Sequence, residues 1–126
     1  MSTNVIVWAS IPCTDLERAV KFYRHVTGHE IFRMPGMEDQ VATIVGEPGE
    51  MSVSCDLSTS GKPGADGSTA YLSAFGDIQG MVARVKEAGG TVLQEPQNMG
   101  EMVGWVAFFI DSEGNRMGIQ QPVKEA

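Results

Sequence analysis

The feature that most constrains this chain is a repeat, because the same amphipathic helix is predicted in both halves at a fixed spacing. In each half, four apolar residues recur at the i, i+3, i+4, i+7 spacing that places side chains on one helix face. The two sets lie 62 residues apart and are Leu16, Ala19, Val20 and Tyr23, then Ile78, Met81, Val82 and Val85. Asp15 and Asp77 precede the two stripes, and Gly28 and Gly90 follow them, at the same offset. We therefore interpret the chain as one structural unit present twice.

Each unit is predicted to be a strand, a helix and three further strands. In the first half, β-branched and aromatic runs predict strands over residues 4–11, 29–33, 40–45 and 51–57. The helix is expected over 15–27, with Thr14 and Glu17 spaced as a capping box. The second half repeats this order with strands over 69–75, 91–96, 104–110 and 116–121. Residues 58–68 are small, polar and rich in glycine, which is typical of a flexible connector.

The size of the repeat predicts how the two units pack. A chain of 126 residues is long enough for one core, whereas a unit of half that length buries too little surface to be stable alone. We therefore predict a single α+β domain over 1–126, with module one at about 4–57, the connector at 58–68 and module two at about 69–122. The modules should be related by a pseudo-twofold axis, with the helices outside and curved mixed sheets forming a cup. Such a cleft is where a small molecule usually binds.

Charge and hydropathy exclude several classes of partner. The formal net charge of −7 repels phosphate backbones, so we expect no nucleic acid partner. No stretch approaches the roughly 18 apolar residues of a membrane span, so we expect no membrane partner and a cytoplasmic protein. Cys13 and Cys55 form no CxxC motif, and we interpret them as reduced, buried thiols.

Three segments carry a resemblance to a known family. The segment VWASIPCTDLERAVKFYRHVTGHE resembles the opening strand and helix of glyoxalase/bleomycin-resistance/dioxygenase proteins, the vicinal oxygen chelate superfamily. DIQGMVARVKEAGGTV and WVAFFIDSEGNRMGI resemble the second helix and the terminal hairpin of that family. The resemblance covers both modules and implies the two-module fold and a homodimer. The connector is long enough for modules to pair within one chain or between two chains.

The resemblance also implies four metal-ligand positions, and this chain departs from the family there. Seven residues before Asp15, the first position is Trp8, and its counterpart is Ala70, or Thr69 if residues 75–76 form a bulge. The third position, in the last strand of module two, is Gly118. The fourth position is Val53, because the two turns before these strands align at an offset of 65 residues. First-row metals need imidazole, carboxylate or thiolate donors. We therefore expect no metal and no other cofactor.

Catalytic candidates are few. Cys13 precedes a predicted helix N-terminus, where a thiol pKa can fall, but no histidine is near it in sequence. Acid or base chemistry by Glu30, Asp56 or Glu101 stays open, although nothing pairs these residues. The connector contains GKPGADG, which lacks the spacing of a phosphate-binding loop.

Ligand binding is better supported by the pattern. Strand alternation points Trp8 and Ser10 into the cup and Ala9 and Ile11 toward the helix. Flexible methionines suit adaptable apolar pockets. The predicted ligand-binding residues are Trp8, Ser10, Val53, Met102, Trp105 and Phe108. The alternative for Trp105 and Met102 is ordinary core or interface packing.

The function that these observations favour is metal-independent binding of a small apolar or aromatic molecule, as resistance-type members of the family sequester drugs. One alternative is a metal-free enzyme, a lyase, isomerase or hydrolase, or one whose site a second chain completes. Another is a structural or regulatory protein whose own side chains fill the cup. Fold alone does not separate these classes.

Overall fold

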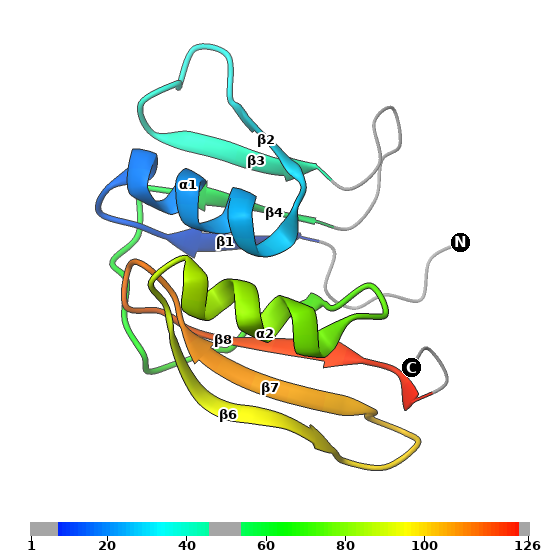
Figure 1. The fold of residues 1–126 in the computed structure, drawn as a ribbon. Coiled ribbons are helices and arrows are strands. Elements are labelled where there is room, and N and C mark those ends of the chain that lie inside the picture. The colour runs from blue at the N-terminus through cyan, green and yellow to red at the C-terminus, as the bar shows by residue number, and fades with distance from the viewer. Residues whose placement is uncertain (1–7, 46–53, 124–126) are drawn as a thin grey trace.

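The computed structural model describes residues 8–45 and 54–123 and confirms the predicted α+β fold (Figure 1). Module one consists of β1 (Trp8–Pro12), α1 (Leu16–Thr27), β2 (Glu30–Arg33), β3 (Val41–Val45) and β4 (Ser54–Ser58). Module two consists of β5 (Tyr71–Ser73), α2 (Ile78–Glu87), β6 (Thr91–Asn98), β7 (Trp105–Ile110) and β8 (Arg116–Gln121). Of the predicted site residues, Val53 lies outside the described residues.

The two mixed sheets have the same topology. Their strand orders are β1-β4-β3-β2 and β5-β8-β7-β6, so the first strand of each module lies at a sheet edge and pairs in parallel with the last. The other neighbours pair antiparallel. In Figure 1 both helices lie on the same side of the sheets, side by side. The two edge strands β1 and β5 belong to separate sheets and do not pair with each other.

The capping of α1 differs from the prediction. Asp15, rather than Thr14, is the N-cap, and its side chain accepts a hydrogen bond from the backbone N–H of Arg18. The predicted capping box is wrong because Thr14 and Glu17 have other partners. The Thr14 hydroxyl donates to Glu113 of module two, and Glu17 forms an ion pair with Arg33. The helix ends as expected at Gly28, whose φ of 70° is the left-handed conformation that glycine adopts most easily.

The helix α2 begins at its predicted cap, Asp77, which accepts a hydrogen bond from Gly80 N. Its end departs from the repeat, because the left-handed residue is Gly89, with φ of 92°, and not Gly90. A Cβ at Gly90 would stand 2.8 Å from Val85 and 3.0 Å from the ring of Phe22. Gly90 therefore permits close packing against α1, whereas Gly89 ends the helix.

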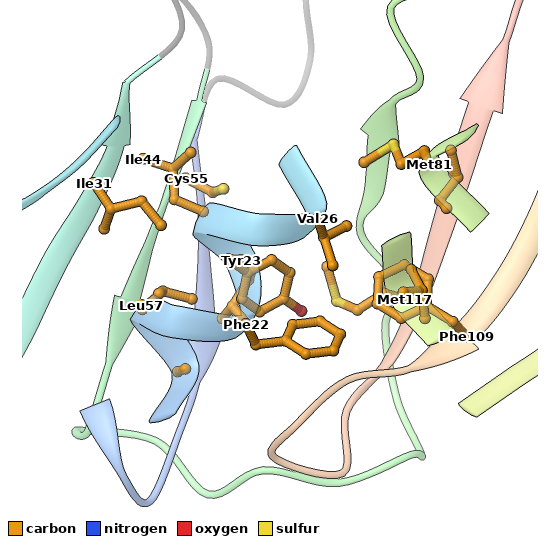
Figure 2. Packing of buried hydrophobic residues seen from close by; sticks show 14 of the residues in the cluster. Phe22, Tyr23, Val26, Ile31, Ile44, Cys55, Leu57, Met81, Phe109 and Met117 are labelled. Atoms are coloured by element: carbon orange, nitrogen blue, oxygen red, sulfur yellow. The ribbon is translucent and has the colours of Figure 1, made fainter. Parts of the chain in front are cut away.

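The predicted helix stripes form one core that spans both modules. Leu16, Ala19, Val20 and Tyr23 are buried on α1, and their four counterparts on α2 are buried as well. Figure 2 shows Phe22, Tyr23 and Val26 of α1 between Leu57 of the first sheet and Met117 and Phe109 of the second. Each such side chain contributes about 1.5–3 kcal/mol when it leaves water. The core therefore depends on both modules being present.

A buried polar network also joins the modules. The Tyr23 hydroxyl donates to Asp111 Oδ2 at 2.6 Å, and burial is the main reason that the pKa of Tyr23 is raised well above its ordinary value. Asn115 donates through Nδ2 to the carbonyl oxygen of Pro12 at 2.7 Å and to Asp111 at 3.0 Å. The turn DSEGN, which carries part of the family resemblance, thus fastens module two to the end of β1.

Candidate functional site

One cavity lies between the two edge strands. Its volume is about 500 Å³, and it is lined by side chains from β1, β4 and β5 together with the segments that follow α1 and β5. Aromatic rings contribute much of this lining, from Trp8, His29, Tyr71 and Phe75. Apolar residues such as Ala9 and Leu72 complete it. We call this space the inter-module cavity.

Trp8 is held at the wall of this cavity by β1. Alternation along the strand buries Ile11 in the core under the helices, whereas Trp8 is 43% exposed. The indole Nε1 donates to Asp56 Oδ2 at 2.7 Å, and Ser10 Oγ donates to the same oxygen at 3.1 Å. Because these hydrogen bonds restrict the ring, Trp8 presents a pre-oriented aromatic surface to the cavity.

Tyr71 forms the opposite wall, on β5. Its ring lies over Gly118 of β8, where an added Cβ would come within 2.5 Å of the tyrosine ring. Tyr71 is also in edge-to-face contact with Phe108, with ring centroids 5.7 Å apart. A glycine at position 118, which leaves room for an aromatic side chain on the neighbouring strand, is the sequence feature that could have indicated this wall.

A second cavity, of about 420 Å³, lies on the module-two sheet and shares Tyr71 with the first. Its lining is mainly apolar and includes Met99, Met102, Val103 and Phe108. Met102 is 98% exposed, so this side of the cavity is open. The guanidinium of Arg116 stands 6.0 Å from the centroid of Phe108.

The structure distributes the predicted site residues over several places. Trp8 lines the inter-module cavity, whereas Met102 and Phe108 line the second cavity. Ser10 hydrogen-bonds to Asp56 and also borders a small groove beside the connector. Trp105 lies on the opposite face of β7 from Phe108, beside the start of α2, because positions three apart on a strand face opposite ways. Trp105 therefore does not share a wall with Trp8 or Phe108.

His29, Tyr71 and Phe75 line the cavity but were not among the residues predicted from the sequence. Phe75 has φ of 51°, and Gly76 after it has φ of 81°, which is the irregularity that was considered for residues 75–76. This extra residue changes the difference in residue number between equivalent positions of the two modules. The difference is 61 before the extra residue, so Ile11 corresponds to Leu72, and 62 after it. Thr69, and not Ala70, is therefore the counterpart of Trp8.

Strand register corrects one further ligand position. Ser10 pairs with Asp56, and Tyr71, the counterpart of Ser10, pairs with Gly118. The counterpart of Gly118 is therefore Asp56 and not Val53. The offset of 65 failed because eight residues separate β3 from β4, whereas five separate β7 from β8.

The residues present do not fit the metal of the family. Trp8, Thr69 and Gly118 offer no imidazole, carboxylate or thiolate. Asp56 is the one carboxylate at these positions: its Oδ2 accepts two hydrogen bonds, and its Oδ1 is buried without a partner among the described residues. Within residues 8–45 and 54–123, no three His, Cys, Asp or Glu side chains lie together in a group able to hold a metal ion. A single carboxylate is too poor a donor set for a first-row ion.

The thiols are poorly placed for nucleophilic chemistry. Burial, followed by the negative charges of Glu113, Asp111 and Asp15, raises the pKa of Cys13 to about 11. Burial and the charge of Asp56 raise the pKa of Cys55 to about 11 as well. Since the thiolate is the reactive form, neither cysteine is activated at neutral pH.

In the described residues, no helix is both long and apolar enough to cross a membrane.

The fold and the cavities define a class: a two-module α+β protein with an aromatic-lined site at the junction of its modules. The model of the Glyoxalase/Bleomycin resistance protein/Dioxygenase superfamily matches residues 5–119, and the chain belongs to that family. No protein with a curated description matches it.

Three solved structures show how widely this fold is shared. TnmS3, an antibiotic binding protein from Streptomyces sp. CB03234, is 26% identical, with 97% of this chain and 98% of that one covered and a TM-score of 0.64. A superfamily member from Sphaerobacter thermophilus is 24% identical over 96% and 99% of the two chains, with a TM-score of 0.68. A hypothetical protein from S. aureus is 23% identical over 96% and 95%, also with a TM-score of 0.68. The last two comparisons support the fold alone.

Proposed function

We propose that this protein binds a small, largely apolar or aromatic molecule in the inter-module cavity, without a metal ion. The observation that carries the proposal is the cavity of about 500 Å³ with Trp8 and Tyr71 in its lining. That volume is within the range of small-molecule sites, and such sites are usually apolar with few polar groups. The similarity to TnmS3, which is an antibiotic binding protein, supports the same class of function.

The chemistry of the site favours binding over catalysis. In the described residues the metal positions offer one carboxylate, that of Asp56, and no group of three donors, and the high pKa of about 11 keeps the buried thiol of Cys13 protonated. Trp8 and Tyr71 can supply apolar and stacking contacts to a planar ligand. We also propose a homodimer, because Met99, Met102 and Val103 expose apolar surface around the second cavity.

The two tryptophans allow a direct test of the cavity. A Trp105→Phe variant keeps Trp8 as the sole indole, so a ligand in the cavity should change its fluorescence on titration. A Trp8→Phe variant keeps Trp105 alone, which lies beside α2 and away from the cavity, and its fluorescence should stay constant. Probes should be aromatic antibiotics and metabolites, first selected by the rise in melting temperature that a ligand specific for the folded state produces.

Affinity then distinguishes a wall residue from a core residue. Replacing Trp8 with Ala should weaken binding of a selected aromatic probe by about 1–3 kcal/mol through lost stacking and apolar contact. Stability should fall less than the roughly 3–5 kcal/mol typical of truncating a core tryptophan. A large loss of stability with unchanged affinity would contradict the placement of the ligand beside Trp8.

A further inference from the structure

His29 is an unexplained polar residue in the lining of the inter-module cavity. Its Nε2 atom is buried and has no hydrogen-bond partner in the described part of the chain. Most buried polar atoms in folded proteins are hydrogen-bonded, so an unpaired ring nitrogen needs a physical explanation. His25, the other histidine, differs in this respect because it pairs with Glu87 on the exposed side of the helices at 2.9 Å.

The position of His29 is fixed by the end of α1. Gly28 turns the chain in the left-handed conformation, and the backbone N–H of His29 then donates to Thr27 Oγ1 at 3.1 Å. Thr27 Oγ1 in turn donates to the carbonyl oxygen of Tyr23 at 2.6 Å. The imidazole is therefore attached to a rigid segment at the cavity wall, as a group that orients a ligand must be.

Phe75 is in ring contact with this imidazole. The two rings meet edge to face with centroids 4.8 Å apart, and Phe75 is itself 63% exposed. Its backbone has φ of 51°, which is unfavourable for a residue with a bulky side chain. Phe75 is therefore a largely exposed aromatic ring beside the imidazole of His29, at the wall of the cavity.

We propose that His29 Nε2 is the polar anchor of the inter-module cavity and that it hydrogen-bonds to a hydroxyl group on an aromatic ligand. This inference rests on the proposed function and narrows its ligand class to phenol-like compounds. A hydroxyl group both donates and accepts, so it can pair with either neutral tautomer of the imidazole. A ligand with a carboxylate is a poorer candidate, since the chain carries a net charge of −7 and the Asp56 carboxylate is hydrogen-bonded to Trp8 of the cavity wall.

The test uses two probes of matched shape, 1-naphthol and 1-methylnaphthalene, measured by equilibrium dialysis with the full chain. Wild-type protein should bind the naphthol about tenfold more tightly, because a site with a buried hydrogen-bonding group rejects an analogue that lacks the partner. His29→Leu should remove this preference and should also raise the melting temperature of the free protein, since it removes an unpaired buried nitrogen.

Two variants control the experiment. His29→Gln keeps a polar group at the same distance from the backbone and should retain part of the preference, and it replaces His29→Leu if that variant does not fold. His25→Leu lies outside the cavity and should leave the preference unchanged. If wild-type protein binds both probes equally and substitution of His29 changes neither affinity, the role of His29 is overturned and the proposed function still stands. Binding of neither probe would overturn both.

Discussion

Glu113 connects the modules through one carboxylate, which makes its removal a sharp test of how the domain is held together. Oε1 accepts hydrogen bonds from the backbone N–H groups of Thr14 and Asp15, at 2.9 and 3.1 Å, at the start of α1. Arg18 donates to both carboxylate oxygens, from Nε at 2.6 Å and from Nη2 at 3.0 Å. Residues from two modules, nearly 100 positions apart, therefore meet at this side chain.

The contacts of Glu113 also change the pKa of its carboxyl group. Burial raises it, but the hydrogen bonds from Arg18 and from the two backbone groups outweigh burial and lower it from 4.5 to about 2. A shift of that size corresponds to roughly 3 kcal/mol, since one pKa unit is about 1.4 kcal/mol. Arg18 is half exposed, so screening by solvent reduces the expected contribution to about 1–3 kcal/mol.

Glu113→Gln should lower the free energy of unfolding by that amount at pH 7, as measured by urea denaturation. A carboxylate with a lowered folded-state pKa stabilises the protein above its unfolded pKa and loses that effect as pH falls through the folded value. The difference between wild type and variant should therefore be full above pH 4.5 and shrink toward pH 2. Glu17→Gln is the matched control, because Glu17 is exposed and its ion pair with Arg33 should contribute less than about 1 kcal/mol. Equal stability of wild type and Glu113→Gln across this pH range would refute the reasoning.

Three further predictions follow from the site and the surface. Gly118→Ala should weaken binding of an aromatic probe severalfold in equilibrium dialysis, because the added Cβ would push against the Tyr71 ring. Gly64→Ala is the control and should bind normally, since the space around Gly64 is open. Equal affinities of the two variants would count against Tyr71 as a wall of the cavity. After incubation with Zn, Ni, Fe or Mn and dialysis, elemental analysis should find less than one ion per chain, and tight stoichiometric binding would show that the ligand positions are wrong. Light scattering at micromolar concentration should give twice the 13.5 kDa mass of one chain, and a monomer would contradict the proposed homodimer.

Much of the fold could be predicted because hydrophobic spacing is a local property of the sequence. The stripe from Leu16 to Tyr23 and its copy on α2 are buried as the period of 3.6 residues requires. The alternation of side chains along a strand likewise predicted that Trp8 and Ile11 of β1 lie on opposite faces, and Ile11 is buried whereas Trp8 is exposed. Both patterns depend only on residues within a few positions of each other, so the buried face of a helix or strand can be predicted without knowing which strand pairs with it.

The composition of the site depended on pairings that local patterns do not encode. Asp56 takes the place expected for Val53 because more residues separate β3 from β4 than separate β7 from β8, and only the strand register reveals which residues face each other. Thr14 does not form the predicted capping box because its hydroxyl donates a hydrogen bond to Glu113 of the other module.

The sequence by itself determined the repeated module and the buried helix faces, since each follows from residue type and spacing. It did not determine all four positions where the family holds a metal, because the strand register places Asp56 where the spacing had placed Val53. Only the tertiary structure decided that Trp8, His29, Tyr71 and Phe75 line one cavity while Trp105 lies elsewhere. The physical reason is that this cavity forms between two edge strands of separate sheets. Its walls depend on how the modules dock through Tyr23, Asp111 and Glu113, and those contacts join residues that are far apart along the chain.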